Sequence, residues 1–128
     1  MPTLERMFGK NRFLANQNLN KENNMKIYIA GKISGNPDYK RQFFSAERIL
    51  KEKGHCVMNP ARIGEGEEFS WNDYMKVSKA MQKVCECVYF IPGWTESKGA
   101  QKEFRRACKD EQLILFNLNS SILDFKKN

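Results

Sequence analysis

The chain has 128 residues and a mass of 15.0 kDa, and 41% of its residues are hydrophobic and 29% charged. This length has room for one compact domain. The apolar runs fall far short of the roughly 20 residues that a membrane-spanning helix needs, which excludes that class of protein. The net charge of +7 favours anionic partners such as nucleotides or nucleic acid.

The first part of the chain differs in composition from the rest. Residues 1–24 are rich in Asn, Gln, Lys, Arg and Glu and show neither helical nor alternating periodicity, which is typical of a mobile extension. They lack the apolar stretch of a secretory signal, so we expect a cytoplasmic protein. Met25 opens an apolar run. We therefore expect a mobile extension over 1–24, a folded domain over 25–118 and a short tail over 119–128.

Strand and helix patterns alternate along the domain. The predicted strands are 27–30, 55–58, 85–91 and 113–116, and the predicted helices are 38–53, 70–84 and 97–110. Residues 61–69 have no period and predict an exposed loop. The alternation predicts a doubly wound α/β fold of the flavodoxin or Rossmann type, in which helices cover both faces of a parallel sheet of four to five strands. Such a fold has three layers, and we expect the first and third strands to be adjacent at its centre.

The cysteine pattern gives little support to a metal site. The four cysteines form no Cys-x-x-Cys pair, and the chain has a single histidine, His55. We therefore expect reduced thiols in the core, no bound metal and no cofactor.

Ligands of doubly wound sheets bind beyond the carboxyl ends of the strands, where the strand order reverses. The loops expected there are 31–37 and 92–97. The first loop offers groups suited to a phosphate: Gly31, Lys32, Ser34 and Gly35. Its sequence is neither Gly-x-Gly-x-x-Gly nor a Walker A motif, and a simple turn is the alternative.

The second loop leads to a predicted helix that begins at Ser97. Its free N–H groups and its dipole favour an anion, although Ser97 would also serve as an ordinary N-cap. Glu103 lies six residues further on and can project toward the same pocket, the alternative being a solvated helix glutamate. Tyr28 in the first strand can reach Glu103, or it is a buried aromatic whose hydroxyl has found another partner.

Four motifs resemble the DUF4406 family. They are Tyr-Ile-Ala-Gly-Lys-Ile-Ser-Gly at 28–35, Asn-Pro-Ala at 59–61, Trp-x-x-Tyr at 71–74, and Ile-Pro-Gly-Trp-x-x-Ser-Lys-Gly-Ala-x-x-Glu at 91–103. The resemblance covers about residues 25–116. The family is in turn similar to a branch of the superfamily of nucleoside 2-deoxyribosyltransferases and 2′-deoxynucleoside 5′-phosphate N-hydrolases.

The resemblance implies a role for each matching residue. Glu103 corresponds to the glutamate that attacks the anomeric carbon, and Tyr28 to the tyrosine that orients it. Ser97 corresponds to a serine that holds a 5′-phosphate. The residues expected to bind substrate are Gly31, Lys32, Ser34, Gly35, Trp94, Ser97 and Gly99. Trp94 and Tyr74 would stack on the base, or they serve only in packing.

The function expected from this resemblance is cleavage or transfer at the N-glycosidic bond of a (deoxy)nucleoside or its 5′-monophosphate. The related enzymes carry an acidic residue at the position of Ser78, and a serine cannot replace an acid. A nucleotide-binding module without turnover is therefore one alternative. A basic nucleic-acid-associated protein that uses Arg105, Arg106 and the N-terminal extension is another. The resemblance also implies a homo-oligomer whose ligand is a nucleoside or nucleotide.

Overall fold

The computed structural model describes residues 24–63 and 68–119. Almost all of the predicted N-terminal extension and most of the predicted tail lie outside these ranges, and so does the middle of the predicted loop 61–69.

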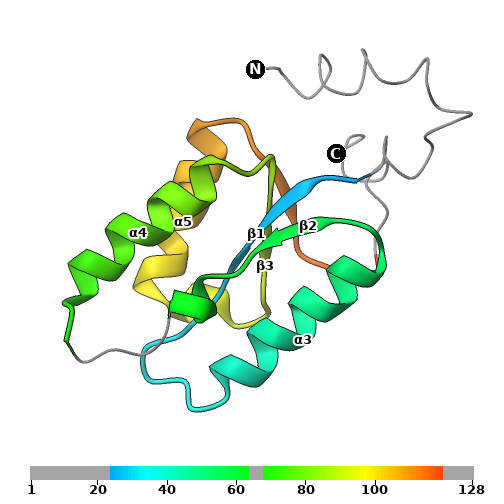
Figure 1. The fold of residues 1–128 in the computed structure, drawn as a ribbon. Coiled ribbons are helices and arrows are strands. Elements are labelled where there is room, and N and C mark those ends of the chain that lie inside the picture. Colours follow the sequence, from blue (N-terminus) through cyan, green and yellow to red (C-terminus); the bar gives the residue numbers. More distant parts are fainter. Residues whose placement is uncertain (1–23, 64–67, 120–128) are drawn as a thin grey trace, which may run out of the picture.

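The domain is built on one parallel sheet with the strand order β2-β1-β3-β4 (Figure 1). The strands are β1 (Lys26–Ala30), β2 (Cys56–Met58), β3 (Cys87–Phe90) and β4 (Leu113–Leu115). Tyr28 at the middle of β1 pairs with Met58 of β2 and with Val88 of β3. The doubly wound fold and the adjacent first and third strands are thus confirmed, with four strands in the described part of the chain.

Three α-helices and two short 3₁₀ helices connect the strands. They are α3 (Tyr39–Glu52), η2 (Pro60–Ile63), α4 (Trp71–Lys83), η3 (Trp94–Glu96) and α5 (Lys98–Lys109). The three predicted helices are confirmed to within two residues at each end. The prediction of a loop over 61–69 is wrong at its start, because the side chain of Asn59 accepts the Ala61 N–H at 2.9 Å and initiates η2.

The two faces of the sheet bury different sets of residues. α3 covers one face, and α4 and α5 cover the other, which gives three layers (Figure 1). Ile27 and Ile29 of β1 lie on the first face with Phe43 and Leu50 of α3. Tyr28 lies on the second face, together with Val88, Phe90 and Ala107. The alternation along β1 therefore directs Tyr28 toward α4 and α5.

Only part of the cysteine prediction holds. All four thiols are free, and burial raises the pKa of Cys85 to about 12. Cys87 is also buried, but Cys56 and Cys108 are exposed, because one begins the edge strand β2 and the other lies on the outer face of α5. Among residues 24–63 and 68–119, no cluster of three His, Cys, Asp or Glu side chains could hold a metal ion. No helix in these ranges has the length and apolar character needed to cross a bilayer.

A buried carboxylate attaches η2 to α3. Glu47 is 4% exposed and accepts hydrogen bonds from Asn59 Nδ2 at 2.8 Å and from Arg62 Nη2 at 2.8 Å. The ammonium of Lys51 lies 2.8 Å from the same carboxylate. Burial raises the pKa of Glu47, but the hydrogen bonds from Arg62, Lys51 and Asn59 outweigh burial and lower it to about 2.

We predict that Glu47→Gln lowers the free energy of unfolding at pH 7 by about 2 kcal/mol, because it leaves buried donors poorly matched. The contribution of Glu47 is complete above the unfolded-state pKa of 4.5 and is lost as the pH falls toward 2, so the difference from wild type should shrink over that window. Urea unfolding at several pH values measures this. Glu52→Gln on the exposed face of the same helix is the matched control, with an expected change below about 0.5 kcal/mol. An equal loss in the two variants would contradict the assignment.

Candidate active site

A cavity of about 390 Å³ lies beyond the carboxyl end of β1. α3, η2, α4 and α5 all contribute to its wall. Its polar side chains include Tyr28, Ser34, Ser78, Ser97 and Glu103. Its aromatic side chains are Tyr39, Phe43, Phe69, Trp71 and Tyr74, besides Tyr28. The position agrees with the predicted binding site, because β1 and β3 are the adjacent strands from which the chain turns to opposite faces of the sheet.

Glu103 and Tyr28 meet in this cavity. Glu103 lies on the buried face of α5 with Ala100 and Ala107 and is only 5% exposed, so the alternative of a solvated helix glutamate is wrong. The hydroxyl of Tyr28 donates a hydrogen bond of 2.5 Å to Glu103 Oε2. The structure thus brings together the two residues that the sequence singled out as the catalytic pair.

The surroundings of Glu103 shift its ionisation toward neutral pH. Burial raises the pKa of Glu103 to about 7, although the Tyr28 hydrogen bond, the charge of Arg106 and the Ser78 hydroxyl each favour the ionised form. Burial also raises the pKa of Tyr28 well above its ordinary value, and the charge of Glu103 adds to that effect. Tyr28 therefore remains a proton donor over the whole range in which Glu103 titrates.

A second layer of polar side chains holds α5 in place behind Glu103. Gln82 of α4 is fully buried, and its Nε2 donates to the backbone carbonyl of Glu103 at 2.9 Å. Arg106 Nη1 donates to Gln82 Oε1 at 2.7 Å, and Gln112 Nε2 donates to the Gln82 carbonyl at 2.9 Å. Sequence analysis missed Gln82 and Gln112. A signal for Gln82 was available, because it follows Ser78 by four residues and therefore lies on the same inward-facing side of the helix.

Ser97 acts as the N-cap of α5. Its Oγ accepts the backbone N–H of Ala100 at 3.0 Å, so the capping alternative is confirmed. Ser97 and Gly99 also line the cavity. A side chain at position 99 would place Cβ 3.1 Å from Met75 Sδ, so Gly99 permits the close approach of α4.

The loop after β1 contributes Gly31 and Ser34 to the cavity, whereas Lys32 and Gly35 are not part of its described lining. Lys32 Nζ lies 3.9 Å from the carboxylate of Glu96, which directs its charge to η3. Gly35 has a φ of +74° and provides the left-handed residue of an exposed turn. Of the four loop residues predicted to bind a phosphate, only Gly31 and Ser34 therefore belong to the described lining of the cavity.

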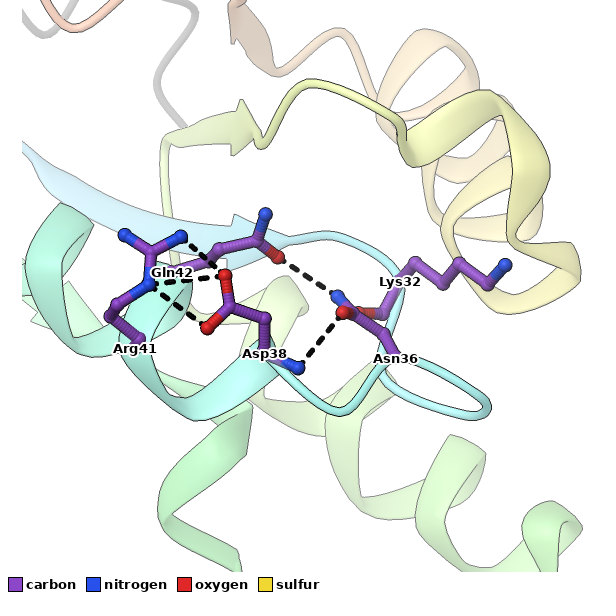
Figure 2. Close-up of polar contacts among 5 residues, drawn as sticks. All are labelled: Lys32, Asn36, Asp38, Arg41 and Gln42. Carbon is purple, nitrogen blue, oxygen red and sulfur yellow. Dashed lines mark hydrogen bonds and ion pairs between the residues drawn. The ribbon is translucent and has the colours of Figure 1, made fainter.

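Asn36 holds this loop in its conformation (Figure 2). Its Nδ2 donates to the Lys32 carbonyl and to Gln42 Oε1, each at 2.8 Å, and its Oδ1 accepts the Asp38 N–H at 3.1 Å. Arg41 pairs with Asp38 at the start of α3. One amide side chain thus connects the end of β1 to α3 and fixes the backbone that presents Gly31 and Ser34.

Trp94 was predicted to stack on the base, but it is not among the described residues that line the cavity. Its ring is stacked on Phe104 with a centroid distance of 5.0 Å and on Phe116 at 6.0 Å, in an aromatic cluster that includes Phe90. The position of Trp94 therefore agrees with the alternative, a role in packing. Phe69, Trp71 and Tyr74 line the cavity in its place, and sequence analysis considered only Tyr74 among them. The Trp-x-x-Tyr motif was the available signal.

Ser78, the position at which the resemblance implies an acid, lines the cavity. Its Oγ donates to the Met75 carbonyl at 3.2 Å, and the residue is buried. Asp73, the acid on the same helix, forms the capping box of α4 with Ser70 and is exposed. Glu103 is therefore the single carboxylate in the described lining of the cavity.

The model of one protein family, a domain of unknown function called DUF4406, matches residues 25–116. The chain belongs to the DUF4406 family. No curated protein and no solved structure shows significant similarity to it. The part of the chain that matches DUF4406 contains every residue described above as lining the cavity.

We predict that Glu103→Gln changes the pH dependence of stability. A carboxyl group whose pKa is higher in the folded state stabilises the fold below pH 4.5, and this contribution is lost as the pH rises to about 7. The glutamine side chain cannot ionise, so the variant should gain about 3 kcal/mol relative to wild type between pH 4 and pH 8. Chemical unfolding at both pH values measures the gain.

Glu52→Gln serves again as the control, since its exposed side chain should show no comparable change with pH. A difference between Glu103→Gln and wild type that stays constant from pH 4 to pH 8 would contradict the raised pKa.

Proposed function

We propose that this DUF4406 domain cleaves or transfers at the N-glycosidic bond of a (deoxy)nucleoside or its 5′-monophosphate. The observation that supports this most is a buried carboxylate, Glu103, that faces a ligand-sized cavity and is oriented by the hydroxyl of Tyr28. The likeness of the DUF4406 motifs to those of nucleoside 2-deoxyribosyltransferases supports the same reaction class.

In the proposed reaction, Glu103 attacks the anomeric carbon C1′ and displaces the base, which leaves a glycosyl ester on the carboxylate. Water or a second base then attacks C1′ from the opposite side and releases Glu103. Two such displacements retain the configuration at C1′, as in retaining glycosidases. Tyr28 holds one carboxylate oxygen at 2.5 Å, which leaves the other oxygen to attack.

The ionisation of Glu103 suits this role at slightly alkaline pH. Only the carboxylate is a nucleophile, and its pKa of about 7 means that the active form accumulates as the pH rises through 7. A carboxylate whose basicity is raised by burial is also a better nucleophile than one in water.

The other residues of the cavity have roles that the resemblance indicates. Ser97, Gly99, Gly31 and Ser34 would contact the sugar or its 5′-substituent. The aromatic side chains that line the cavity would pack against the base. By the same resemblance, we propose a homo-oligomer.

One observation favours a second candidate, a nucleoside-binding or nucleotide-binding module without turnover. The presence of Ser78 in place of an acid leaves the cavity without a second carboxylate among its described residues. Calorimetry with nucleosides and nucleotides, run beside a chromatographic assay of base release, distinguishes the two candidates. Binding without base release at any pH would favour the module.

We predict that Glu103→Gln reduces the rate of base release by at least about 10³-fold while the affinity for substrate changes less than about tenfold. Glutamine keeps the shape of glutamate and accepts the Tyr28 hydrogen bond, but it cannot form the ester. Tyr28→Phe should lower the rate by about 10-fold to 100-fold, because it removes the group that orients the nucleophile. Base release from a panel of nucleosides and 5′-monophosphates, followed by chromatography, measures both.

Glu52→Gln, at an exposed glutamate of α3 outside the described lining of the cavity, is the matched control and should retain full activity. Full activity in Glu103→Gln would show that the carboxylate has no part in the reaction.

A further inference from the structure

Resting on the proposed function, we propose that the cavity takes N-glycosides whose base is a cationic aromatic ring, with pyridinium nucleosides as the simplest class. Three features of the described lining support this substrate class: it offers the leaving group no acid besides Glu103, it carries a single negative charge, and its walls are aromatic.

The first feature is the set of proton donors. A neutral base is a poor leaving group, because its nitrogen gains negative charge unless an acid protonates it. If Glu103 is the nucleophile, the other polar side chains of the described lining are hydroxyls. They are Tyr28, Ser34, Tyr39, Tyr74, Ser78 and Ser97. Serine and tyrosine hydroxyls are poor acids near neutral pH, and Tyr28 already donates to Glu103.

A pyridinium base removes this difficulty. Glu103 forms the C1′–O bond, the C1′–N bond breaks, and its electron pair neutralises the positive ring nitrogen. The base leaves as a neutral pyridine, so no proton is transferred. In the second step the oxygen of water attacks C1′, the ester bond breaks, the proton of water goes to solvent, and Glu103 returns as the carboxylate.

The second feature is charge. Among the described residues that line the cavity, Glu103 is the only one with a charged side chain. Because Glu103 is buried, water screens its negative charge weakly. Three cations of the surrounding structure lie outside this lining and contact other groups: Arg106 donates to Gln82, Lys32 faces Glu96, and Lys102 lies over the ring of Trp71. A cationic ring beside Glu103 gains a Coulomb attraction that a neutral ring lacks.

The third feature is the aromatic wall. The faces of Trp, Tyr and Phe rings attract cations, and enclosing aromatic side chains are the usual means of recognising a quaternary nitrogen. Phe69 and Tyr74 form an edge-to-face pair with a centroid distance of 6.3 Å at the cavity. Trp71 also lines the cavity, and its ring is contacted by Lys102, whose Nζ lies 5.6 Å from the ring centroid.

The test uses two probes of nearly the same shape. Nicotinamide riboside carries the pyridinium charge, whereas benzamide riboside is its neutral counterpart with a C-glycosidic bond that cannot be cleaved. We expect calorimetry on the full chain at pH 8 to show that the wild-type protein binds the cationic probe at least about tenfold more tightly than the neutral probe. Glu103→Gln should reduce this preference to less than about threefold, and the control Glu52→Gln, on the exposed face of α3, should leave it unchanged.

Turnover gives an independent readout. Release of nicotinamide from its riboside and 2′-deoxyriboside should exceed release of uracil from the matching uracil nucleosides by at least about 100-fold. The rate on the pyridinium substrates should rise through the ionisation of Glu103 and then stay level to pH 9, because no acid has to remain protonated.

Equal affinity for the two probes, or faster release of uracil than of nicotinamide, would overturn the proposed preference. If uracil is released faster than nicotinamide and this release depends on Glu103, the preference for cationic bases is wrong but the proposed N-glycosidic chemistry stands. Failure to bind or cleave any of these nucleosides would overturn the proposed preference, and failure on the whole panel of nucleosides and 5′-monophosphates would overturn the N-glycosidic chemistry as well.

Discussion

The hydrogen bond between Tyr28 and Glu103 is the interaction on which the rest of the site depends. It joins the central strand β1 to α5 inside the layer where a polar pair has little access to water. Burial of a carboxyl group opposes its ionisation, and a single strong donor only partly offsets that cost. The result is a carboxyl group that changes charge near neutral pH in a fixed orientation. Such a group adds reactivity at some expense of stability, as functional sites commonly do.

The surrounding structure keeps this pair in position from two sides. On the side of α4, the amide of Gln82 links the backbone at Glu103 to Arg106, so the second half of α5 cannot shift without breaking buried hydrogen bonds. On the side of α3, Asn36 fixes the loop after β1, and Glu47 fixes η2. These polar contacts determine the shape of a cavity whose walls are largely apolar. The doubly wound topology brings the two supports together at the carboxyl end of β1.

The sequence predicts the sheet, its central strands and the meeting of Tyr28 with Glu103, because each leaves a periodic or local signal. A short continuous apolar run marks β1, and the interval from Ser97 to Glu103 places both residues in the first half of one helix and its cap. The roles of Lys32, Gly35 and Trp94 could not be predicted in this way. Lys32 lies beside Glu96, and Trp94 stacks on Phe104 and Phe116, which are distant from it in sequence. Gln82 was also missed, since its partners lie 21 to 30 residues away in the chain.

The claim that Glu103 is a nucleophile has a direct chemical test. A 2′-fluoro-substituted nucleoside slows the breakdown of a glycosyl ester more than its formation, so the intermediate should accumulate. Intact mass spectrometry of the protein after incubation at pH 8 should show the added mass of one fluorinated sugar, and peptide mapping should place it on Glu103. Glu103→Gln should show no adduct. An unmodified wild-type protein that nevertheless releases the base, or an adduct on any other residue, would contradict the account.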